Sequence, residues 1–285
     1  MKAVKFSYEV KQRHWVGDGF FVHGLLRPEK ELNDYISPFI LMDYASPKMF
    51  PKTDQQKGVG PHPHRGFETV TLAYQGEVEH LDSSGGGGII KEGDVQWMTA
   101  GKGIVHQEYH SKEFSSKGGL FEMVQLWVNL PKKQKMTKAK YQEIKQNDIP
   151  SMPIGKSSTI RIIAGEISDN HGPAETFTMI NMLDISSNDN DHIKLPLKED
   201  TNTILLILKG SLQMDKKDYS EQSVLIFNRE GTELCFKTSA DFKALILNGT
   251  PIDEPVVAHG PFVMNSEQEI MDAFEDYRNG KMGKL

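Results

Sequence analysis

The sequence predicts an all-β fold, and three observations support this class. Short apolar or alternating runs recur along the whole chain and are separated by Gly, Asn, Asp or Pro. Their spacing is even, as in β-barrels and β-sandwiches. Stretches with helical periodicity are few, and 285 residues are enough for about two such domains.

Each predicted strand is a short run rich in aliphatic, β-branched and aromatic residues, which favour a pleated, partly buried backbone. The runs are FILMDY, TVTLAYQG, GDVQWM and MVQLWVNL in the first half, and TILLILKG, SVLIF and KALILNG in the second. Trp97 and Met98 are expected to pack in a core. The run SSGGGG lacks a Gly-Lys-Ser/Thr ending, so it predicts a mobile hairpin tip and not a phosphate loop.

Between the halves the chain carries five lysines within residues 132–140. We place the domain boundary here, with an N-terminal domain over 1–140 and a C-terminal domain over 141–285. Lysines without interleaved aromatic residues favour a solvated linker over a nucleic-acid contact. A patch for an acidic partner is the alternative.

The last predicted element is a short helix that ends near Gly280. Ser266 and Glu269 form a Ser-x-x-Glu capping box, a start signal of helices. Behind it, Ile270, Met271 and Phe274 make one apolar face. This C-terminal helix is the exception in an otherwise all-β chain.

Composition limits the partners and the compartment. With 33 Lys+Arg against 39 Asp+Glu, the net charge of −6 disfavours generic nucleic-acid binding. The single cysteine, Cys235, cannot form an intramolecular disulfide, and no apolar run approaches the length of a membrane span. The N-terminus does not resemble a secretory leader, so the expected location is the reducing cytoplasm.

Two pairs of polar residues indicate a metal site. His62 and His64 flank a proline, and His106 and Glu108 repeat the spacing about forty positions later. Side chains at i and i+2 leave the same face of a strand, so two such strands facing each other bring four ligand atoms together. A lone histidine is usually a hydrogen-bonded core residue, whereas these four together favour a ligand set.

Three imidazoles and one carboxylate suit divalent first-row metals such as iron, nickel, copper, zinc, manganese or cobalt. An octahedral ion held by four protein atoms keeps two positions open for a bidentate substrate, or for a substrate oxygen beside dioxygen. The residue pattern leaves the carboxylate undecided. Glu68 shares the inward parity of His64 if the strand runs unbroken, and it could replace Glu108.

The same parity assigns the neighbouring side chains. Arg65 and Phe67 have the opposite parity and are expected to face out of the barrel. His80 and His110 suit an outer-sphere or solvent-facing position better than a fifth ligand position.

The two halves look like an old duplication in which one copy kept the chemistry. When glycines that end matching runs are aligned, the ligand positions fall on Pro196, Lys198, Phe236 and Thr238. No second His-x-His is present, so the C-terminal domain is predicted to lack a metal site.

At these residues the chain resembles the pirin family of the cupin superfamily. The matching stretches are PFILMDYASP, HPHRGFETVT, GDVQWMTAGKGIVHQE and EPVVAHGPFVMN, which together span nearly the whole chain. The resemblance implies two tandem cupin (jelly-roll) barrels, with the metal in the N-terminal one. It maps the ligands onto His62, His64, His106 and Glu108, with iron as the usual metal, and leaves Glu68 as an outer residue.

The resemblance also implies one of two functions. Several pirins are quercetin 2,3-dioxygenases, oxidoreductases that open the central ring of this flavonol with both atoms of O2. The enzyme would take an aromatic substrate and O2, with Glu108, or Glu68 nearby, accepting the hydroxyl proton. The alternative is a regulatory protein read by a transcription factor or a metabolic enzyme, through the exposed face around Arg65 and the lysine-rich linker.

Overall fold

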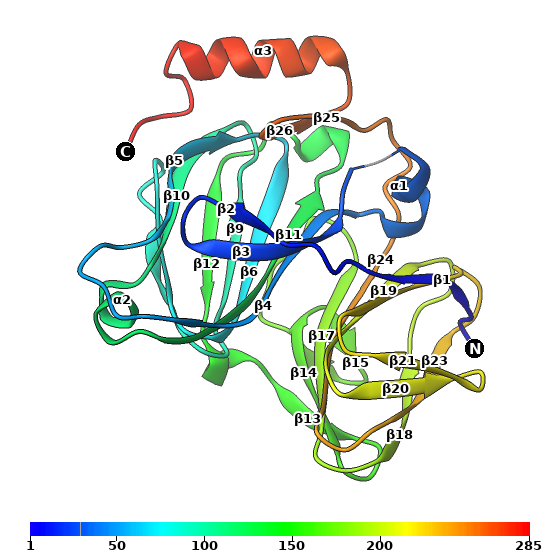
Figure 1. Ribbon diagram of the computed structural model, residues 1–285. Coiled ribbons are helices and arrows are strands. Elements are labelled where there is room, and N and C mark those ends of the chain that lie inside the picture. The colour runs from blue at the N-terminus through cyan, green and yellow to red at the C-terminus, as the bar shows by residue number, and fades with distance from the viewer. Residues whose placement is uncertain (29) are drawn as a thin grey trace. The chain divides into compact units, whose positions relative to one another are not determined.

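The computed structural model describes residues 1–28 and 30–285, and β-strands dominate it (Figure 1). The chain divides into two compact units, each with a seven-stranded and a four-stranded antiparallel sheet. The first barrel consists of Gln12–Pro28, Phe39–Gln146 and Ile252–Leu285. The second barrel consists of Met1–Lys11, Glu29–Pro38 and Asn147–Pro251.

In the first barrel the two sheets pack on one apolar core. The large sheet, in spatial order, is β12 (Lys140–Ile144), β9 (Val95–Thr99), β6 (Phe67–Gln75), β11 (Gly119–Asn129), β4 (Phe39–Phe50), β3 (Phe20–Leu26) and β2 (His14–Val16). The small sheet is β5 (Gly58–His64), β10 (Ile104–His110), β7 (Val78–Asp82) and β8 (Gly87–Ile90). Both contribute to the core, the large sheet through Phe20 and Phe121 and the small sheet through Val78 and Ile90.

The second barrel is built in the same way. Its large sheet is β1 (Val4–Glu9), β22 (Ser223–Phe227), β19 (Asn202–Lys209), β24 (Phe242–Gly249), β17 (Ile180–Ser187), β14 (Ser158–Ala164) and β13 (Ser151–Ile154). Its small sheet is β18 (Asp191–Pro196), β23 (Glu233–Thr238), β20 (Ser211–Met214) and β21 (Lys217–Ser220). The core joins Leu205 and Phe227 of the large sheet to Leu195 and Leu234 of the small one.

Short elements complete the chain. They are α1 (Lys30–Ile36), α2 (Lys112–Lys117), the 3-10 turns η1 (Lys132–Gln134) and η2 (Gln146–Asp148), and the strand pairs β15 (Glu166–Ile167) with β16 (Asn170–His171) and β25 (Val257–His259) with β26 (Phe262–Met264). Among the described residues, no helix has both the length and the apolar character needed to cross a bilayer.

The strand orders of the two barrels agree position by position, as the duplication predicts. One difference concerns the strand at the edge of the large sheet. β12 pairs with β9 in the first barrel, whereas the equivalent place in the second barrel is taken by β1, which pairs with β22. The N-terminal residues therefore complete the barrel formed by the later part of the chain.

The predicted division between residues 140 and 141 lies close to the observed one, which falls between Gln146 and Asn147. The prediction is wrong for the two chain ends, because each belongs to the barrel formed mainly by the other half of the chain. Residues 1–11 belong to the second barrel and residues 252–285 to the first. The physical reason lies in long-range pairing. β1 covers the open edge of β22, and an edge strand without such a partner exposes its backbone hydrogen-bonding groups.

The SSGGGG run forms the turn between β7 and β8 and the first two residues of β8, which confirms the predicted hairpin, while its mobility stays a prediction. Asp82 orders this turn, because its Oδ1 accepts hydrogen bonds from Ser84 N at 2.8 Å, Ser84 Oγ at 2.6 Å and Gly86 N at 3.1 Å. Burial alone would raise the pKa of Asp82, but hydrogen bonds, the largest from His80, lower it to about 2.

The predicted C-terminal helix is α3 (Glu267–Arg278). Ser266 caps it by accepting from Glu269 N, while Glu269 Oε2 accepts from Asn265 N, one residue before the position that a capping box uses. Ile270 is buried as predicted, but Met271 is 56% exposed, so its assignment to the apolar face is wrong. The adjacent position is rotated about 100° around the helix axis, which carries Met271 towards solvent.

Candidate metal centre

The four predicted ligands lie on β5 and β10. The prediction that these strands face each other is wrong. They are hydrogen-bonded neighbours in the small sheet, with His62 directly opposite His106. A shift of register beyond this pair places Glu108 opposite Val59. The shift is a β-bulge in β5, which re-aims side chains locally.

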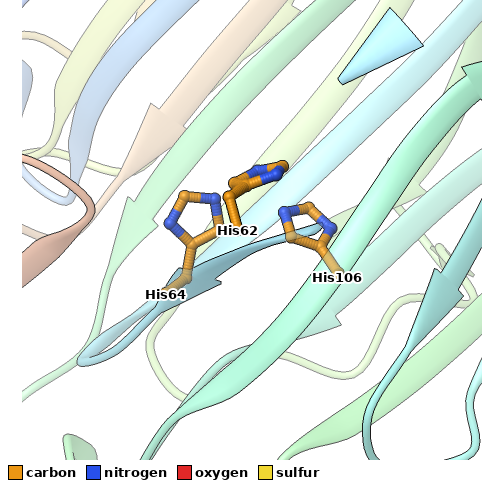
Figure 2. A group of neighbouring side chains, drawn as sticks. All are labelled: His62, His64 and His106. Carbon is orange, nitrogen blue, oxygen red and sulfur yellow. The ribbon is translucent and has the colours of Figure 1, made fainter. Parts of the chain in front are cut away.

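Figure 2 shows the imidazole rings of His62 and His64, from β5, gathered with that of His106, from β10. The ring centroids of His62 and His106 are 4.2 Å apart, and each is 4.9 Å from that of His64. The candidate ligand nitrogens all lie within 4.8 Å of one another. One ion with bonds of about 2.1 Å sets opposite ligands about 4 Å apart, so the spacing is suited to a single metal.

Each of these rings is held in place through Nδ1. His62 Nδ1 lies 2.8 Å from Gly60 O, and His64 Nδ1 lies 3.1 Å from Pro261 O. An imidazole that donates from one nitrogen to a carbonyl presents the other nitrogen as a metal ligand. The anchoring therefore selects Nε2 of both histidines as the candidate ligand atom.

His106 is held by a second histidine. Its Nδ1 lies 3.3 Å from His80 Nδ1, while His80 Nε2 lies 3.3 Å from Asp82 Oδ2. His106 Nε2 is buried and lacks a hydrogen-bond partner within the part of the chain that the structure describes. A buried polar nitrogen without a partner costs free energy, so its position fits an ion at this point.

His80 is fully buried, so of the two positions favoured from the sequence the solvent-facing one is wrong, while the outer-sphere one stays a prediction. Gln96 Nε2 lies 3.0 Å from His80 Nδ1, and the ring of Tyr141 stacks on that of His80 with centroids 5.1 Å apart. His80 also forms a second group of potential ligands with His106 and Glu108, within 4.8 Å of one another.

Glu108 is therefore close to His106, and its nearest group of potential ligands contains His80 and not the His-x-His pair. Residues of the large sheet hold its carboxylate from across the barrel. Gln125 Nε2 lies 3.2 Å and 3.0 Å from the two carboxylate oxygens, and Thr71 Oγ1 donates to Oε1 at 3.3 Å. These neutral donors orient the carboxylate and add no opposing charge.

Glu68 does not join either ligand group among the described residues. The strand does not run unbroken, because β5 ends at His64 and β6 begins at Phe67, with Gly66 between them at φ +87°. Glu68 lies in the large sheet, where Thr99 Oγ1 donates to its Oε1 at 2.7 Å. Burial raises the pKa of Glu68 to about 7.

The sequence predicts that Arg65 and Phe67 face out of the barrel, with an exposed face around Arg65, but both side chains are buried, so the predicted exposure at Arg65 is wrong. Arg65 Nε donates to Lys102 O at 2.7 Å, and the ring of Phe67 packs on that of Trp127 with centroids 4.3 Å apart. The C-terminal β26 covers this edge, as the bridge between Arg65 and Phe262 shows. The alternation of side chains along one strand cannot predict that a distant segment of the chain packs on its outer face.

The lysine-rich stretch is solvated only in part. Lys133, Lys138 and Lys140 are exposed, but Lys135 is 1% exposed. Its ammonium donates to Gly66 O, Asn129 Oδ1 and Val263 O, each at 2.8 Å. Burial lowers the pKa of Lys135 to about 7.

Burial also sets the charge state of the histidines. It lowers the pKa of His64 to about 3 and that of His106 well below its usual range, with smaller contributions from neighbouring imidazoles. Both rings are therefore neutral near pH 7, the state that binds metals. His110 is neither a ligand nor solvent-facing, because the rings of Phe20, Phe50, Phe114 and Phe121 surround it.

Two cavities lie away from this cluster. One, of about 640 Å³, is in the second barrel and is lined by residues including His171, Asn181 and Lys198. The other, of about 530 Å³, is in the first barrel beside Trp15 and Lys48. None of the four predicted ligands lines either cavity.

Comparison with known families agrees with the geometry. The family model Pirin matches residues 23–128, and the model Pirin C-terminal cupin domain matches residues 182–283. The chain belongs to the pirin family. The predicted fold of two cupin domains with a short C-terminal helix is thereby confirmed for this pirin.

Three similar proteins extend the comparison. This pirin is 46% identical to a Pseudomonas aeruginosa protein named "Putative quercetin 2,3-dioxygenase PA2418", over 99% of this chain and 98% of that protein. It is 38% identical to the pirin-like protein of Solanum lycopersicum, over 94% and 88%. The crystal structure of a quercetin 2,3-dioxygenase from Acinetobacter baumannii superposes with a TM-score of 0.96 at 49% identity, covering 100% of this chain and 99% of that one.

The sequence reasoning missed the residues that hold the cluster. Gln125 and Gln96 are buried or partly buried polar residues inside runs that are mainly apolar, whereas Thr71 lies in a strand with several polar residues. That local exception to an apolar pattern was the available signal, because a buried polar side chain needs a hydrogen-bond partner. Its partner could not be named without the pairing of the sheets.

Proposed function

We propose that this pirin is a metal-dependent dioxygenase that uses O2 to open the ring of quercetin or a related flavonol. The proposed mononuclear site is formed by His62, His64, His106 and Glu108, with iron first among the candidate metals and nickel, copper, zinc, manganese or cobalt as the others. The observation that carries the proposal is the cluster of three anchored imidazoles around the unpartnered His106 Nε2. The relatives named as quercetin dioxygenases support the substrate class.

The donor set fits the expected metal, since three nitrogens and one oxygen are ligands for borderline divalent ions. When bound, such an ion acts as a Lewis acid that lowers the pKa of a coordinated hydroxyl. The protein supplies the rest. Its buried neutral imidazoles are ready to bind without losing protons, and the carbonyls of Gly60 and Pro261 keep two of the rings oriented.

Glu108 is the candidate proton acceptor. A carboxylate has two oxygens, so one can bind an ion while the other accepts a proton from a substrate hydroxyl within hydrogen-bonding distance. Gln125 contacts both oxygens and so fixes the plane of the carboxylate. Glu68 is held by Thr99 in the other sheet, and we do not assign it this role.

The surroundings of the cluster suit an aromatic substrate. His62 is the partly exposed member, whereas His64 and His106 are buried, so access is from the side of His62. The rings of Phe67 and Trp127 lie 5.0 Å and 5.2 Å from that of His64. Phe67 is fully buried, so the partly exposed Trp127 is the candidate stacking partner of a flat aromatic substrate.

The test combines metal analysis with an aerobic assay. Protein purified without added ions is analysed for metals, loaded with each candidate ion, and mixed with quercetin while the flavonol absorbance and the release of carbon monoxide are followed. We expect turnover by the wild type with at least one ion and none by His106→Ala. His192→Ala, an exposed histidine on β18, is the control. Absence of turnover with all of the ions would refute the dioxygenase proposal.

The regulatory alternative is not favoured by the structure, because the face around Arg65 is covered. The regulatory alternative makes one distinct prediction: the protein binds its protein partner only when the metal site is occupied. Equal capture of a partner by wild type and by metal-free His62→Ala would contradict that claim.

A further inference from the structure

The C-terminal segment, which we define as residues 257–283, belongs to the same unit as the candidate metal centre. It comprises the β25–β26 pair, α3 and the residues after α3. In Figure 1 the helix runs along β25 and β26, at the end of the first barrel where β5 is labelled. Its contacts fall on the backbone stretches that carry the candidate ligands.

The first contact is with the end of β5. Pro261 O accepts the hydrogen bond from His64 Nδ1 at 3.1 Å, and Val263 N donates to Arg65 O at 3.1 Å. Gly66 approaches so closely that a β-carbon there would overlap Val263 O. A candidate ligand is thus oriented by a carbonyl almost two hundred residues later in the chain.

The second contact is an ion pair under the helix. Arg65 follows His64 directly, and its side chain is 5% exposed. Its guanidinium donates to Asp276 Oδ2 of α3 at 2.9 Å. The same guanidinium holds Lys102 O at 2.7 Å, just before β10. Arg65 is buried whereas the side chain of Asp276 is 24% exposed, so loss of the carboxylate would leave a buried guanidinium without its charged partner.

The third contact is with β10 and the β7–β8 turn. Val105, which precedes His106, packs in an apolar cluster with Phe262, Ile270 and Met282. Ser83 Oγ donates to Met282 O at 2.7 Å and accepts from Val105 N at 3.0 Å. The segment therefore supports the backbone on both sides of the His106–His80 contact.

We propose that the C-terminal segment is a positioning element of the metal centre, whose docking and metal binding stabilise each other. The inference rests on the proposed metal site. Loss of a group that orients a ligating imidazole typically weakens metal binding by about 10- to 100-fold. Linkage is reciprocal, so bound metal must tighten the docked segment by the same factor.

The first experiment weakens the docking of the C-terminal segment with a single substitution in α3. Asp276→Asn keeps the size of the side chain but removes the charge that pairs with Arg65 and, through its other oxygen, with Lys281. The matched control is Asp272→Asn on the same helix, an exposed aspartate whose hydrogen bond is to Gln268 of that helix. Co²⁺ is the probe, with its affinity measured by chelator competition and its visible absorption bands reporting coordination geometry.

We expect Asp276→Asn to bind Co²⁺ more weakly by up to about 10-fold, the lower end of the range for direct partners of a ligand, because Asp276 acts on His64 only through Arg65. Its absorption bands should change, and Asp272→Asn should match the wild type within about twofold. Circular dichroism checks that both variants fold. Wild-type affinity and bands in a folded Asp276→Asn protein would overturn the coupling.

The second experiment needs no variant. Amide hydrogen exchange of residues 261–283 is measured in the wild type with and without Co²⁺. We expect slower exchange in the loaded protein, and identical exchange would overturn the coupling while leaving the metal site in place. A wild type that binds no Co²⁺ would overturn the metal site and the coupling together. A protein that binds Co²⁺ but does not turn over quercetin would disprove only the dioxygenase activity.

Discussion

At the scale of single residues, the charge of the buried histidines links the site to stability. His64 has a pKa of about 3 in the folded protein, chiefly because of burial, against an ordinary value of 6.5. Between these two values the unfolded chain binds more protons than the folded protein. This histidine therefore contributes stability that is present above pH 6.5 and is lost as the pH falls towards 3.

The resulting prediction concerns the metal-free protein. Between pH 6.5 and 5, the free energy of unfolding of the wild type should fall more steeply than that of His64→Gln, by up to about 1.4 kcal/mol per pH unit. Urea denaturation at several pH values measures both slopes. Glu68 and Lys135 also titrate abnormally, but they are present in both proteins and cancel in the difference. Equal slopes would show that His64 is not protected from protons.

At the scale of elements, the turn between β5 and β6 decides which side chains meet. Gly66, at φ +87°, ends the strand that carries His64 and lets β26 approach. The turn transfers the chain from the small sheet to the large one. Glu68 consequently moves away from the ligands although its sequence spacing matches theirs.

Two glycines with nearly the same φ separate the effect of backbone strain from that of steric overlap. Gly85 has φ +88° and open space where a β-carbon would lie, whereas a β-carbon at Gly66 would overlap Val263 O. Gly85→Ala should cost about 1 to 2 kcal/mol of stability, the cost of a left-handed conformation. Gly66→Ala should cost at least about 3 kcal/mol, because backbone overlap is added. Chemical denaturation compares the two, and similar losses would contradict the close approach of β26.

At the scale of the whole molecule, two barrels with one strand order differ in the small sheet, which carries a polar cluster beside the apolar core in the first barrel and mainly apolar core residues at the matching strands of the second. In the first barrel the small sheet presents histidines and Glu108. In the second, the buried positions of β18 and β23 include Ile193, Leu195, Leu234 and Phe236. Of the positions named from the sequence, Phe236 and Thr238 are buried, while Pro196 and Lys198 are exposed. The second interior is thus a packed apolar core.

This difference predicts independent roles for the two barrels. Leu195→Ala should cost about 2 to 5 kcal/mol through a cavity in the second core, while Co²⁺ still binds with wild-type affinity at one ion per chain. Lys194→Ala removes its exposed neighbour, which forms an ion pair with Glu233, and should leave the stability close to that of the wild type, because water screens an exposed pair. Urea denaturation and metal titration make the two measurements. A second tightly bound ion in the wild type would contradict the assignment of one site.

Much of the fold follows from local pattern. The apolar runs are strands because alternating burial has a period of two, and the capping signal at Ser266 starts a helix whatever the helix packs against. The same period placed His62, His64 and His106 on one face, and the structure brings these three together. Glu108 lies beside His106 but is grouped with His80, so its role as the fourth ligand stays a prediction.

The sequence by itself determined the residue types and their spacing along each strand, since both depend on the nearest few positions. Only the tertiary structure decided the rest. It breaks the strand at Gly66, buries Arg65 and Lys135, and brings Pro261 O to His64. These features arise between segments far apart in the chain, where free sheet edges and unpaired polar groups select their partners, and no local periodicity records that choice.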